Sequence, residues 1–533
     1  MPKKTINENL KIENTDEHWA YKIADKLIKN NPKKKKFICA AGISPSGKIH
    51  IGNFRDIITS DLVCRALRDK GFKAELIFSW DDYDRFRKVP AGIPESFSKY
   101  IGMPLSEIPD PNNCHKSYAQ HFEKEFEEIV AELGLSPRFI YQSQEYSKNR
   151  YFNGIKTALQ KRQEIAKILA QFKTQGMTDA EAGEYYPLQI YCSKCKKDFT
   201  KIIDYDNDNK ITYECKCGHK EIVDISKKNI GKLAWKIDWA MRWSEEDVAF
   251  EPGGEDHATP GGSYDVSSRI AKEIFKINPP EFQGYGFVGI EGITKMSGSS
   301  GTGITPKDLL KIYEPELLRW IFTRANPKKE ITLFFDTEII RQYDEFDKEV
   351  EEFYKNDERK KEIILSSINS NKFPEKIRTP FRQVASFGQI AQGNFEELKN
   401  FFERIGQDYD EQALKIRLEK SQNWIENFAP ELKIKLRNLP NKEYFKKLNE
   451  KEKKEIVKLK ENLNSNWDLE KLTALVYEIP KETNINDEEK KKRQRNFFKN
   501  VYQLLIDNDT GPRLPAFLLA VGKEKIKAIL QFN

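Results

Sequence analysis

The feature that most constrains the fold is a strand–loop–helix–strand segment near the start of the chain. Residues 37–43, with the sequence FICAAGI, have the continuous apolar character of a short buried strand. After a Pro/Ser/Gly loop, residues 51–71 carry apolar side chains at helical spacing and end at a glycine. Residues 72–80, FKAELIFSW, have the pattern of a second strand. Because a helix joins the two strands, the segment predicts an α/β protein with a Rossmann-like, doubly wound parallel sheet.

Composition along the chain indicates further regions. Residues 85 to about 230 have the composition of an insertion, with acidic helices and a Cys-rich ribbon, and residues 231–300 return to strands and Gly-rich loops. After about residue 340 glycine becomes scarce and the pattern is that of long amphipathic helices, with apolar residues at Phe445, Leu448, Ile456, Leu459 and Leu463. We therefore expect a catalytic domain over residues 1–340 and an all-α region over residues 341–533.

The overall composition suits a cytoplasmic soluble protein. The chain has 533 residues, of which 38% are hydrophobic, and no run of 18 apolar residues that would predict a membrane span. The N-terminal stretch lacks the apolar core of a secretion signal. The net charge of +7 permits a nucleic-acid partner but does not require one, because scattered lysines commonly solvate a surface.

The loop between the first strand and its helix has the features of an anion site. His50 lies at the first helical turn, and Asn53 lies three residues later on the same face. A helix N-terminus at the carboxyl end of a parallel strand attracts anions, and both side chains can donate hydrogen bonds to phosphate. The alternative is a capped helix with a surface histidine. The candidate phosphate-binding residues are Pro45, Ser46, Gly47, His50, Gly52 and Asn53.

A second candidate for phosphate binding is the Gly/Ser-rich segment KMSGSSG, which begins at Lys295. A mobile loop with one lysine can close over a triphosphate and neutralise a departing pyrophosphate. The alternative is that the segment is only a linker. The candidate residues are Lys295, Met296, Ser297, Gly298 and Ser299.

Four of the seven cysteines form two close pairs about 20 residues apart, Cys192 with Cys195 and Cys215 with Cys217. Without a secretion signal, such pairs predict metal ligands rather than disulfides. The spacing, with a hairpin between the pairs, predicts a tetrahedral structural zinc ribbon. His219 is the alternative to Cys217 as the fourth ligand.

A second cluster combines Asp110, Cys114, His115 and His121. A carboxylate, a thiolate and two imidazoles suit zinc. The spacing alone favours a zinc site and a capped helix with polar surface residues equally.

Several of these segments together resemble one family. The motifs PSGKIHIGN and KMSGS resemble the HIGH and KMSKS boxes of class I aminoacyl-tRNA synthetases. Further segments resemble the class I lysyl-tRNA synthetases, and they extend over almost the whole chain: DDYDRFRKVP, IPDPNNCHKSYAQHF, KLAWKIDWAMRW, PGGEDHATPGGSYD and GPRLPAFLLAVGKEKI. Asn53 stands where the general class pattern has its second histidine, and Gly298 where it has its second lysine, so Gly298 leaves Lys295 as the main cation of its loop. The resemblance also favours zinc at the cluster around Cys114.

The resemblance implies an amino-acid pocket for lysine. An ammonium group needs a carboxylate or an aromatic wall, and the α-carboxylate needs a donor. For Trp235 and Tyr285, packing in the core is the alternative. The candidates are Gly42, Ser44, Trp235, His257 and Tyr285.

A group of acidic residues, Asp81, Asp82 and Asp84, follows the second strand, where ligands bind in such sheets. They are additional pocket candidates, although they could instead pair with Arg85 and Arg87. In glutamate and glutamine relatives, an arginine that holds the substrate side chain stands at the position of Ala40, so its absence argues against an acidic substrate.

The implied reaction has two steps. Lysine attacks the α-phosphate of ATP to give lysyl-adenylate and pyrophosphate, and the lysyl group then passes to the terminal ribose of tRNA(Lys), by class resemblance to the 2′-hydroxyl. His50, Asn53 and Lys295 are the expected catalytic residues, and Mg²⁺ is expected with ATP. The C-terminal helices would bind the anticodon, with residues 490–502 as a candidate contact. We expect a monomer.

Three other functions remain possible at this point: a glutamyl-type synthetase, a nucleotidyltransferase of the HIGH superfamily, and a non-catalytic zinc-containing RNA-binding protein. The nucleotidyltransferase should lack a large C-terminal helical region. The RNA-binding protein would not need His50 or Lys295.

Overall fold

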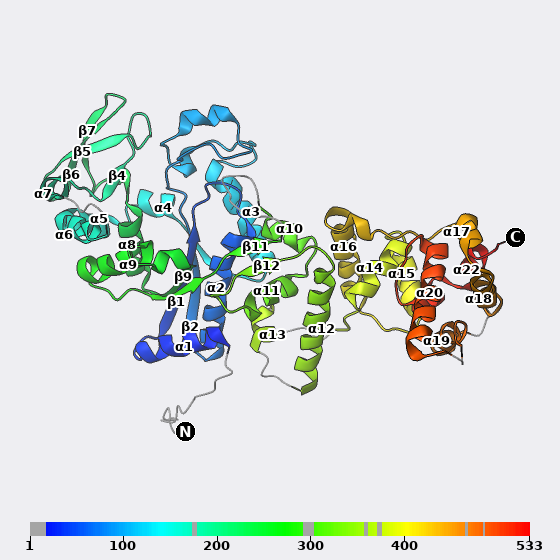
Figure 1. Cartoon of the computed structure of the whole chain (residues 1–533). Helices are drawn as coiled ribbons and strands as arrows, with labels where there is room; N and C mark the ends of the chain where they lie inside the picture. Colours follow the sequence, from blue (N-terminus) through cyan, green and yellow to red (C-terminus); the bar gives the residue numbers. More distant parts are fainter. Residues whose placement is uncertain are drawn as a thin grey trace, which may run out of the picture. The chain divides into compact units, whose positions relative to one another are not determined.

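The computed structural model describes residues 18–172, 178–291, 303–356, 361–369, 376–463, 467–482 and 485–532. Its contacts divide the chain into two compact units (Figure 1). The first comprises Met1–Lys307, Leu318–Leu333 and Lys360–Phe373, and the second comprises Asp308–Leu317, Phe334–Arg359 and Pro374–Asn533. The chain therefore passes between the units several times, whereas composition suggests a single boundary near residue 340.

A five-stranded parallel sheet forms the centre of the first unit, in the order β10-β9-β1-β2-β3. Its strands are β1 (Lys36–Ile43), β2 (Lys73–Trp80), β3 (Arg138–Tyr141), β9 (Val248–Gly254) and β10 (Glu281–Tyr285). Strands are added first on one side of β1 and then on the other, so the direction of winding reverses between β1 and β9. The predicted doubly wound parallel sheet is confirmed, and its switch point is the expected place for a ligand.

The first strand–helix–strand segment has the predicted form. β1 is buried from Phe37 to Ala41 and pairs in parallel with β2. Helix α2 (Ile51–Asp69) packs on both strands, and the hydroxyl of Ser60 donates to the carbonyl of Ala40 at 2.8 Å. This contact joins the middle of α2 to the middle of β1.

The segment between about residues 85 and 230, expected to be one continuous insertion, is interrupted by a strand of the main sheet. Residues 138–141 return to the main sheet as β3, which pairs in parallel with β2. Four residues, of which only Ile140 is buried, carry too little apolar pattern to predict a strand.

The segment from Lys232 to Trp243, expected among strands, is mostly helical. β8 (Gly231–Leu233) is short, and α8 (Trp235–Glu246) follows it. Every residue from 237 to 243 is buried, so the helix has no exposed polar face whose period would reveal it. This correction matters because α8 lines the candidate site.

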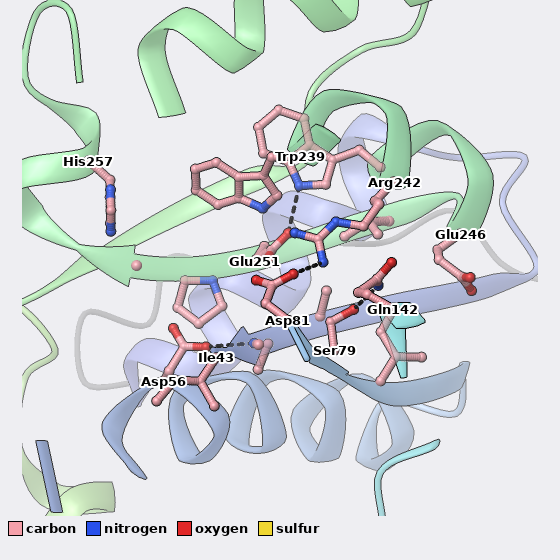
Figure 2. A pocket seen from close by; sticks show the side chains of 18 of the residues that line it. Ile43, Asp56, Ser79, Asp81, Gln142, Trp239, Arg242, Glu246, Glu251 and His257 are labelled. Atoms are coloured by element: carbon pink, nitrogen blue, oxygen red, sulfur yellow. Dashed lines mark hydrogen bonds and ion pairs between the residues drawn. The ribbon is translucent and has the colours of Figure 1, made fainter. Parts of the chain in front are cut away.

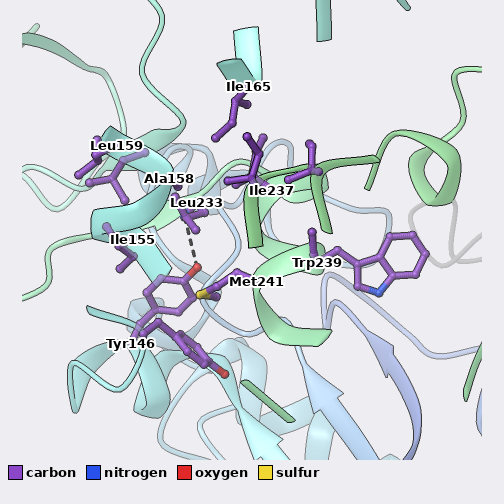
Figure 3. Packing of buried hydrophobic residues seen from close by; sticks show 14 of the residues in the cluster. Tyr146, Ile155, Ala158, Leu159, Ile165, Leu233, Ile237, Trp239 and Met241 are labelled. Atoms are coloured by element: carbon purple, nitrogen blue, oxygen red, sulfur yellow. Dashed lines mark hydrogen bonds between the residues drawn. The ribbon is translucent and has the colours of Figure 1, made fainter. Parts of the chain in front are cut away.

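The hydrophobic core around α8 fixes that helix in place (Figure 3). Ile155, Ala158 and Leu159 of α5 (Phe152–Gln160) belong to the same buried cluster as Ile237 and Met241 of α8. A Cβ atom at Gly154 would lie 2.5 Å from Cγ of Met241, so only glycine permits this approach of the two helices.

The Cys-rich ribbon has the predicted hairpin. β5 (Thr200–Tyr205), β6 (Lys210–Cys215) and β7 (Lys220–Asp224) form an antiparallel sheet. Two further two-stranded sheets pair β4 (Leu188–Ile190) with β8, and β11 (Val288–Ile290) with β12 (Ile331–Leu333). The other helices up to residue 366 are α1 (Trp19–Asn30), α3 (Tyr118–Glu132), α4 (Gln142–Ser147), α6 (Arg162–Ala170), α7 (Asp179–Gly183), α9 (Ser263–Ile270), α10 (Pro306–Leu310), α11 (Pro315–Arg324) and α13 (Lys361–Ser366).

The second unit is helical throughout its described residues, as predicted for the C-terminal region. The expected long helix around Phe445–Leu463 is divided into α17 (Lys442–Lys447) and α18 (Glu450–Glu461), because Asn449 caps a new helix start. Its helices beyond residue 334 are α12 (Glu338–Asn356), α14 (Phe381–Ile390), α15 (Phe395–Arg404), α16 (Glu411–Asn427), α17 (Lys442–Lys447), α18 (Glu450–Glu461), α19 (Leu469–Glu478), α20 (Asp487–Ile506), α21 (Leu514–Val521) and α22 (Lys523–Ile529). None of the described helices has the length and hydrophobicity of a bilayer-spanning segment.

Candidate active site

A cavity of about 130 Å³ lies at the switch point of the parallel sheet (Figure 2). Its lining includes residues 40–43 of β1, Pro252 and Gly253 of β9, and side chains of α2 and α8. Ala40, the position that argues against an acidic substrate, is part of this lining. The cavity therefore occupies the place where doubly wound sheets bind their ligands.

The start of α2 adjoins the cavity. His50 is the N-cap residue, and its backbone N–H donates to Oδ1 of Asn53, which itself lines the cavity. Burial lowers the pKa of His50 and so favours its neutral form. A Cβ atom at Gly52 would lie 2.9 Å from Nδ1 of His50, so glycine leaves space for this imidazole.

The chain that follows the second phosphate-binding candidate contacts the start of α2. Lys295, Met296, Ser297, Gly298 and Ser299 lie outside the described residues. The chain that follows them is described from residue 303, and the carbonyl of Ile304 accepts the N–H of Ile51 at 2.9 Å. The segment after the KMSGS motif is therefore bonded to the first turn of α2.

The loop before α2 is bonded to the start of α3. The hydroxyl of Tyr118, at the start of α3, donates to the carbonyl of Ser46 at 2.9 Å. Gly47 borders a separate hollow together with Tyr118 and His121. Neither Pro45 nor Ser46 lines the central cavity.

Four of the five lysine-binding candidates line the cavity: Gly42, Trp235, His257 and Tyr285. Ser44 does not. Trp235 stacks on Trp239 with ring centroids 5.0 Å apart and remains 38% exposed, so packing in the core is not its sole role. Gly42 approaches β2 so closely that a Cβ atom there would lie 2.9 Å from the carbonyl oxygen of Ser79.

A carboxyl group not predicted from the sequence, Asp56, lies at the α2 end of the cavity. It accepts from the backbone N–H of Gly42 at 3.1 Å and from the hydroxyl of Tyr285 at 3.0 Å. Burial raises the pKa of Asp56 to about 8. Asp56 follows Asn53 by three residues, so helical spacing was the signal that could have found it.

A second unpredicted carboxyl group, Glu251 of β9, lies against the aromatic wall of α8. It accepts from Nε1 of Trp243 at 2.6 Å, and burial raises its pKa. No ion pair compensates its charge among the described residues. Gln142 also lines the cavity, and its buried Oε1 atom has no hydrogen-bond partner within the described part of the chain.

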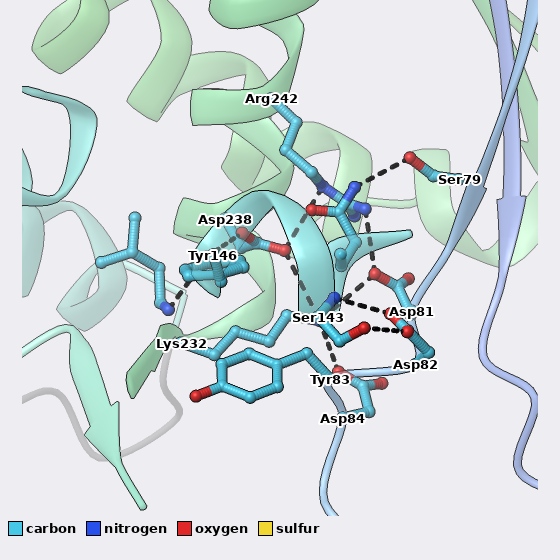
Figure 4. Close-up of polar contacts among 12 residues, drawn as sticks. Ser79, Asp81, Asp82, Tyr83, Asp84, Ser143, Tyr146, Lys232, Asp238 and Arg242 are labelled. Atoms are coloured by element: carbon cyan, nitrogen blue, oxygen red, sulfur yellow. Dashed lines mark hydrogen bonds and ion pairs between the residues drawn. The ribbon is translucent and has the colours of Figure 1, made fainter. Parts of the chain in front are cut away.

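A buried network of charges lies beneath this end of the cavity (Figure 4). Nζ of Lys232 lies 3.2 Å from Asp81 and 2.5 Å from Asp84, and Arg242 donates to Asp81 at 2.9 Å. Burial opposes ionisation of Asp81, but Arg242 and Lys232 outweigh it and lower the pKa of its carboxyl group. The network also includes Asp238, which accepts from Tyr146, and it joins β2, β8 and α8.

The alternative pairing suggested by the sequence for these acidic residues is wrong. Asp82 accepts from the backbone N–H and hydroxyl of Ser143, and Arg85 pairs with Asp198 at 3.0 Å. The basic residues that pair with Asp81 come from β8 and α8, about 150 residues later in the chain, which local sequence cannot reveal.

The four cysteines of the ribbon come together. Sγ of Cys192 lies 3.7 Å from that of Cys217, and Sγ of Cys195 lies 3.6 Å from that of Cys215. Zn–S bonds of about 2.3 Å in a tetrahedron place sulfur atoms about 3.8 Å apart, so this set fits zinc. His219 instead contacts Ser193 at 3.0 Å, which leaves Cys217 as the fourth donor.

The second cluster also brings its four candidates together. Sγ of Cys114 lies 3.1 Å from Asp110 and from Nδ1 of His115, and 3.2 Å from Nδ1 of His121. The donor atoms of the four residues lie within 4.8 Å of one another, as a metal ion requires. Ser117 caps α3 beside them, so both sequence interpretations describe real features of this segment.

The candidate RNA contact at residues 490–502 forms most of α20. Phe497 and Tyr502 are buried in the core of the second unit, and Phe498 packs against that core while remaining partly exposed. Lys491, Lys492 and Arg495 are exposed. The segment therefore presents charge but little aromatic surface.

A switch-point cavity beside a helix start is where doubly wound α/β proteins bind nucleotides. The chain matches the family model described as "tRNA synthetases class I (K)" over residues 17–369. It therefore belongs to this family of class I tRNA synthetases.

Relatives from bacteria and archaea are similar over nearly the whole chain. A lysine–tRNA ligase of Borreliella burgdorferi is 36% identical over 530 residues, covering 96% of this chain and 98% of its own. A lysine–tRNA ligase of Pyrococcus horikoshii is 36% identical over 522 residues, covering 95% and 98%. A lysine–tRNA ligase of Streptomyces coelicolor is 35% identical over 573 residues, covering 97% and 98%.

Proposed function

We propose that the protein is a lysine–tRNA ligase that forms lysyl-adenylate and pyrophosphate from L-lysine and ATP, and then transfers lysine to the 3′-terminal adenosine of tRNA(Lys). The observation that carries the choice of amino acid is the charge of the switch-point cavity. Of the carboxyl groups that line it, Asp81 and Glu246 are paired with basic side chains, whereas Asp56 and Glu251 have no ion pair among the described residues. Such a site favours a substrate that carries an additional positive charge.

Glu251 is the proposed partner of the lysine ε-ammonium group. Asp81 is paired with Arg242 and Lys232, and Glu246 is paired with Arg138 and Arg150. Among the described residues Glu251 accepts a side-chain hydrogen bond only from the neutral indole N–H of Trp243, so an ammonium ion gains most there. Gln142 Oε1 offers a further acceptor at this end of the cavity.

Asp56 is the proposed partner of the α-ammonium group. With Gly42 and Tyr285 around it, this carboxyl group lies beside Asn53 and the start of α2. Lysine bound between Asp56 and Glu251 directs its α-carboxylate toward the helix start, where ATP must present its α-phosphate. The other proposed lysine contacts are Ser44, Trp235 and His257.

The adenylation step rests on positioning and charge stabilisation. His50 and Asn53 at the helix N-terminus donate to phosphate oxygens as charge develops, and Lys295 neutralises the pyrophosphate that leaves. The remaining proposed ATP contacts are Pro45, Ser46, Gly47, Gly52, Met296, Ser297, Gly298 and Ser299. Mg²⁺ bound with ATP supplies further neutralisation. The lysyl group then passes to the 2′-hydroxyl of the terminal ribose, and the protein works as a monomer in the cytoplasm.

Two zinc ions are proposed as structural components, one held by Cys192, Cys195, Cys215 and Cys217 and one by Asp110, Cys114, His115 and His121. Four protein donors leave no open position for catalysis. The second site precedes Tyr118, so a zinc ion there stabilises the helix start that holds the carbonyl of Ser46.

Metal analysis tests the ligands of the ribbon. The purified protein should contain two equivalents of zinc, and Cys217→Ser should reduce this to one, because three donors bind zinc more weakly than four. His219→Ala is the matched control and should retain both. Loss of zinc in His219→Ala but not in Cys217→Ser would show that the ligand set is wrong.

Substitution of Glu251 tests the lysine site. Glu251→Gln keeps an acceptor for Trp243 but removes the charge, so the KM for lysine should rise about 10- to 150-fold, the equivalent of about 1.5–3 kcal/mol for a hydrogen bond to a charged group. The KM for ATP should stay within about twofold. The measurement is lysine-dependent ATP–pyrophosphate exchange.

Glu246→Gln is the matched control, because Glu246 lines the same cavity but is paired with two arginines. It should change the KM for lysine only slightly. A larger rise in the KM for lysine in Glu246→Gln than in Glu251→Gln would show that Glu251 is not the partner of the ε-ammonium group.

A further inference from the structure

Arg55 lies on helix α2, two residues after Asn53, but does not line the switch-point cavity. It is 2% exposed and forms no ion pair with any described residue. Burial lowers the pKa of Arg55 to about 10, which leaves its guanidinium group charged at neutral pH. A buried charge without an ionic partner is tolerated only where hydrogen bonds compensate it, so the acceptors of Arg55 define its role.

The guanidinium group of Arg55 bonds two segments that lie 231 to 274 residues later in the chain. Nη1 donates to the carbonyl of Gly286 at 2.6 Å and to that of Phe287 at 3.1 Å. Nη2 donates to the carbonyls of Pro327 and Lys329, at 2.8 and 2.6 Å. A rigid fork of N–H donors can reach acceptors on both segments at once, which the compact ammonium group of a lysine does not do.

The two segments also contact each other. The N–H of Gly286 donates to the carbonyl of Pro327 at 2.9 Å, and the N–H of Ile331 donates to the carbonyl of Phe287 at 3.0 Å. A Cβ atom at Gly286 would lie 3.1 Å from the carbonyl oxygen of Lys328, so glycine permits this close approach. Arg55 therefore holds together the backbone that leads into strands β11 and β12.

The residue that precedes the first segment is Tyr285, one of the proposed lysine contacts. Its hydroxyl donates to Asp56 at 3.0 Å, and the centroid of its ring lies 6.0 Å from Cζ of Arg55. Neighbouring residues of α2 therefore hold the same tyrosine, Asp56 at the hydroxyl and Arg55 at the ring and the following backbone. A shift of that backbone would move the hydroxyl away from Asp56, the proposed partner of the α-ammonium group.

We propose that Arg55 is a positioning residue for lysine binding, which keeps the hydroxyl of Tyr285 on Asp56 by holding the backbone that follows Tyr285. The proposal rests on the lysine–tRNA ligase function and deepens the assignment of the α-ammonium site. Because Arg55 does not line the cavity, its substitution acts on lysine through Tyr285 and Asp56.

ATP–pyrophosphate exchange by the full-length protein, with tRNA present, tests the proposal. Arg55→Lys keeps the charge but loses the fork that joins the two segments. The KM for lysine should rise about 10- to 100-fold, as expected when a contact group is misplaced by about 1 Å. The KM for ATP and kcat should change by less than about twofold, as expected when only uniform binding of lysine is lost.

Gly286→Ala disturbs the same backbone without altering Arg55. The added Cβ atom would press on the carbonyl of Lys328 and separate the two segments. The KM for lysine should therefore rise in this variant too. Gly286→Ala tests the proposal even where Arg55→Lys gives little folded protein.

A double-mutant comparison shows whether Arg55 acts through Tyr285. Tyr285→Phe alone removes the hydroxyl and should raise the KM for lysine. In that background Arg55→Lys should change the KM for lysine by less than about twofold, because the contact that Arg55 positions is already absent. Effects of the two substitutions that multiply in the double variant would overturn the proposal.

Arg65→Lys is the matched control. Arg65 lies nearer the C-terminal end of α2, is also buried, and donates to the carbonyls of Ser367 and Gly134 at 2.6 and 2.7 Å. Both arginine-to-lysine substitutions should lower the thermal unfolding midpoint, whereas only Arg55→Lys should raise the KM for lysine. This difference separates positioning from a general loss of stability.

An unchanged KM for lysine in both Arg55→Lys and Gly286→Ala would overturn the proposal, as would an equal rise in Arg65→Lys or a fall in kcat with an unchanged KM. The intact enzyme would still show lysine-dependent exchange in those cases, so the ligase function would stand. Absence of lysine-dependent exchange in the intact enzyme would instead contradict the ligase function itself, and with it the role of Arg55.

Discussion

Replacing either His50 or Lys295 by alanine should lower kcat for lysyl-adenylate formation by about 10²- to 10³-fold, as expected when one donor to developing charge is removed. His50 caps the helix that begins beside the cavity, and the chain beyond Lys295 is bonded to the same helix start through Ile304. Both side chains should therefore act on the phosphates of ATP. Single-turnover formation of adenylate measures the effect.

The matched control for Lys295→Ala is Lys328→Ala, which removes an exposed lysine of the same unit and should retain full activity. Binding of tRNA should be unaffected in all three variants. Unchanged adenylate formation in both His50→Ala and Lys295→Ala, with tRNA binding retained, would contradict the catalytic assignment and favour a non-catalytic RNA-binding protein.

Replacing Lys232 by methionine should destabilise the first unit by about 3–5 kcal/mol, because removal of one member of a buried ion network leaves the others uncompensated. Lys232 is buried and lies within 4 Å of Asp81, Asp84 and Asp238. The expected result is a lower urea midpoint for the transition reported by tryptophan fluorescence, since Trp239 and Trp243 lie on the adjoining helix.

Lys36→Met is the control for this substitution. Lys36 pairs with Glu75 on the surface, with 55% of its side chain exposed, so its loss should cost less than about 1 kcal/mol. Equal effects of the two substitutions would show that the buried network does not hold α8 against the sheet.

The parts of the fold that sequence predicts correctly are those with strong local patterns. β1 is a continuous apolar run, and α2 has a defined start after a Pro/Ser/Gly loop and a glycine just beyond its end, so their form and pairing follow from the residues alone. The proximity of the side chains in the two clusters proposed to bind zinc was also predicted, because each cluster has ligand spacing that is visible within about 30 residues.

The missed features depend on contacts between distant residues. α8 is buried along its middle, so it has no amphipathic pattern that predicts a helix. Without that helix, the positions of Trp239 and Arg242 in the cavity lining could not be predicted. Glu251 and Gln142 belong to elements far apart in the chain that meet only in the folded sheet.

The central claim is that this cavity activates lysine, and ATP–pyrophosphate exchange with each amino acid, with and without tRNA, tests it most directly. Exchange should occur with lysine and should be lost in His50→Ala and Lys295→Ala. Lysine exchange that appears only with tRNA would add that tRNA completes the site. Exchange with glutamate in place of lysine, or no exchange under either condition, would contradict the account.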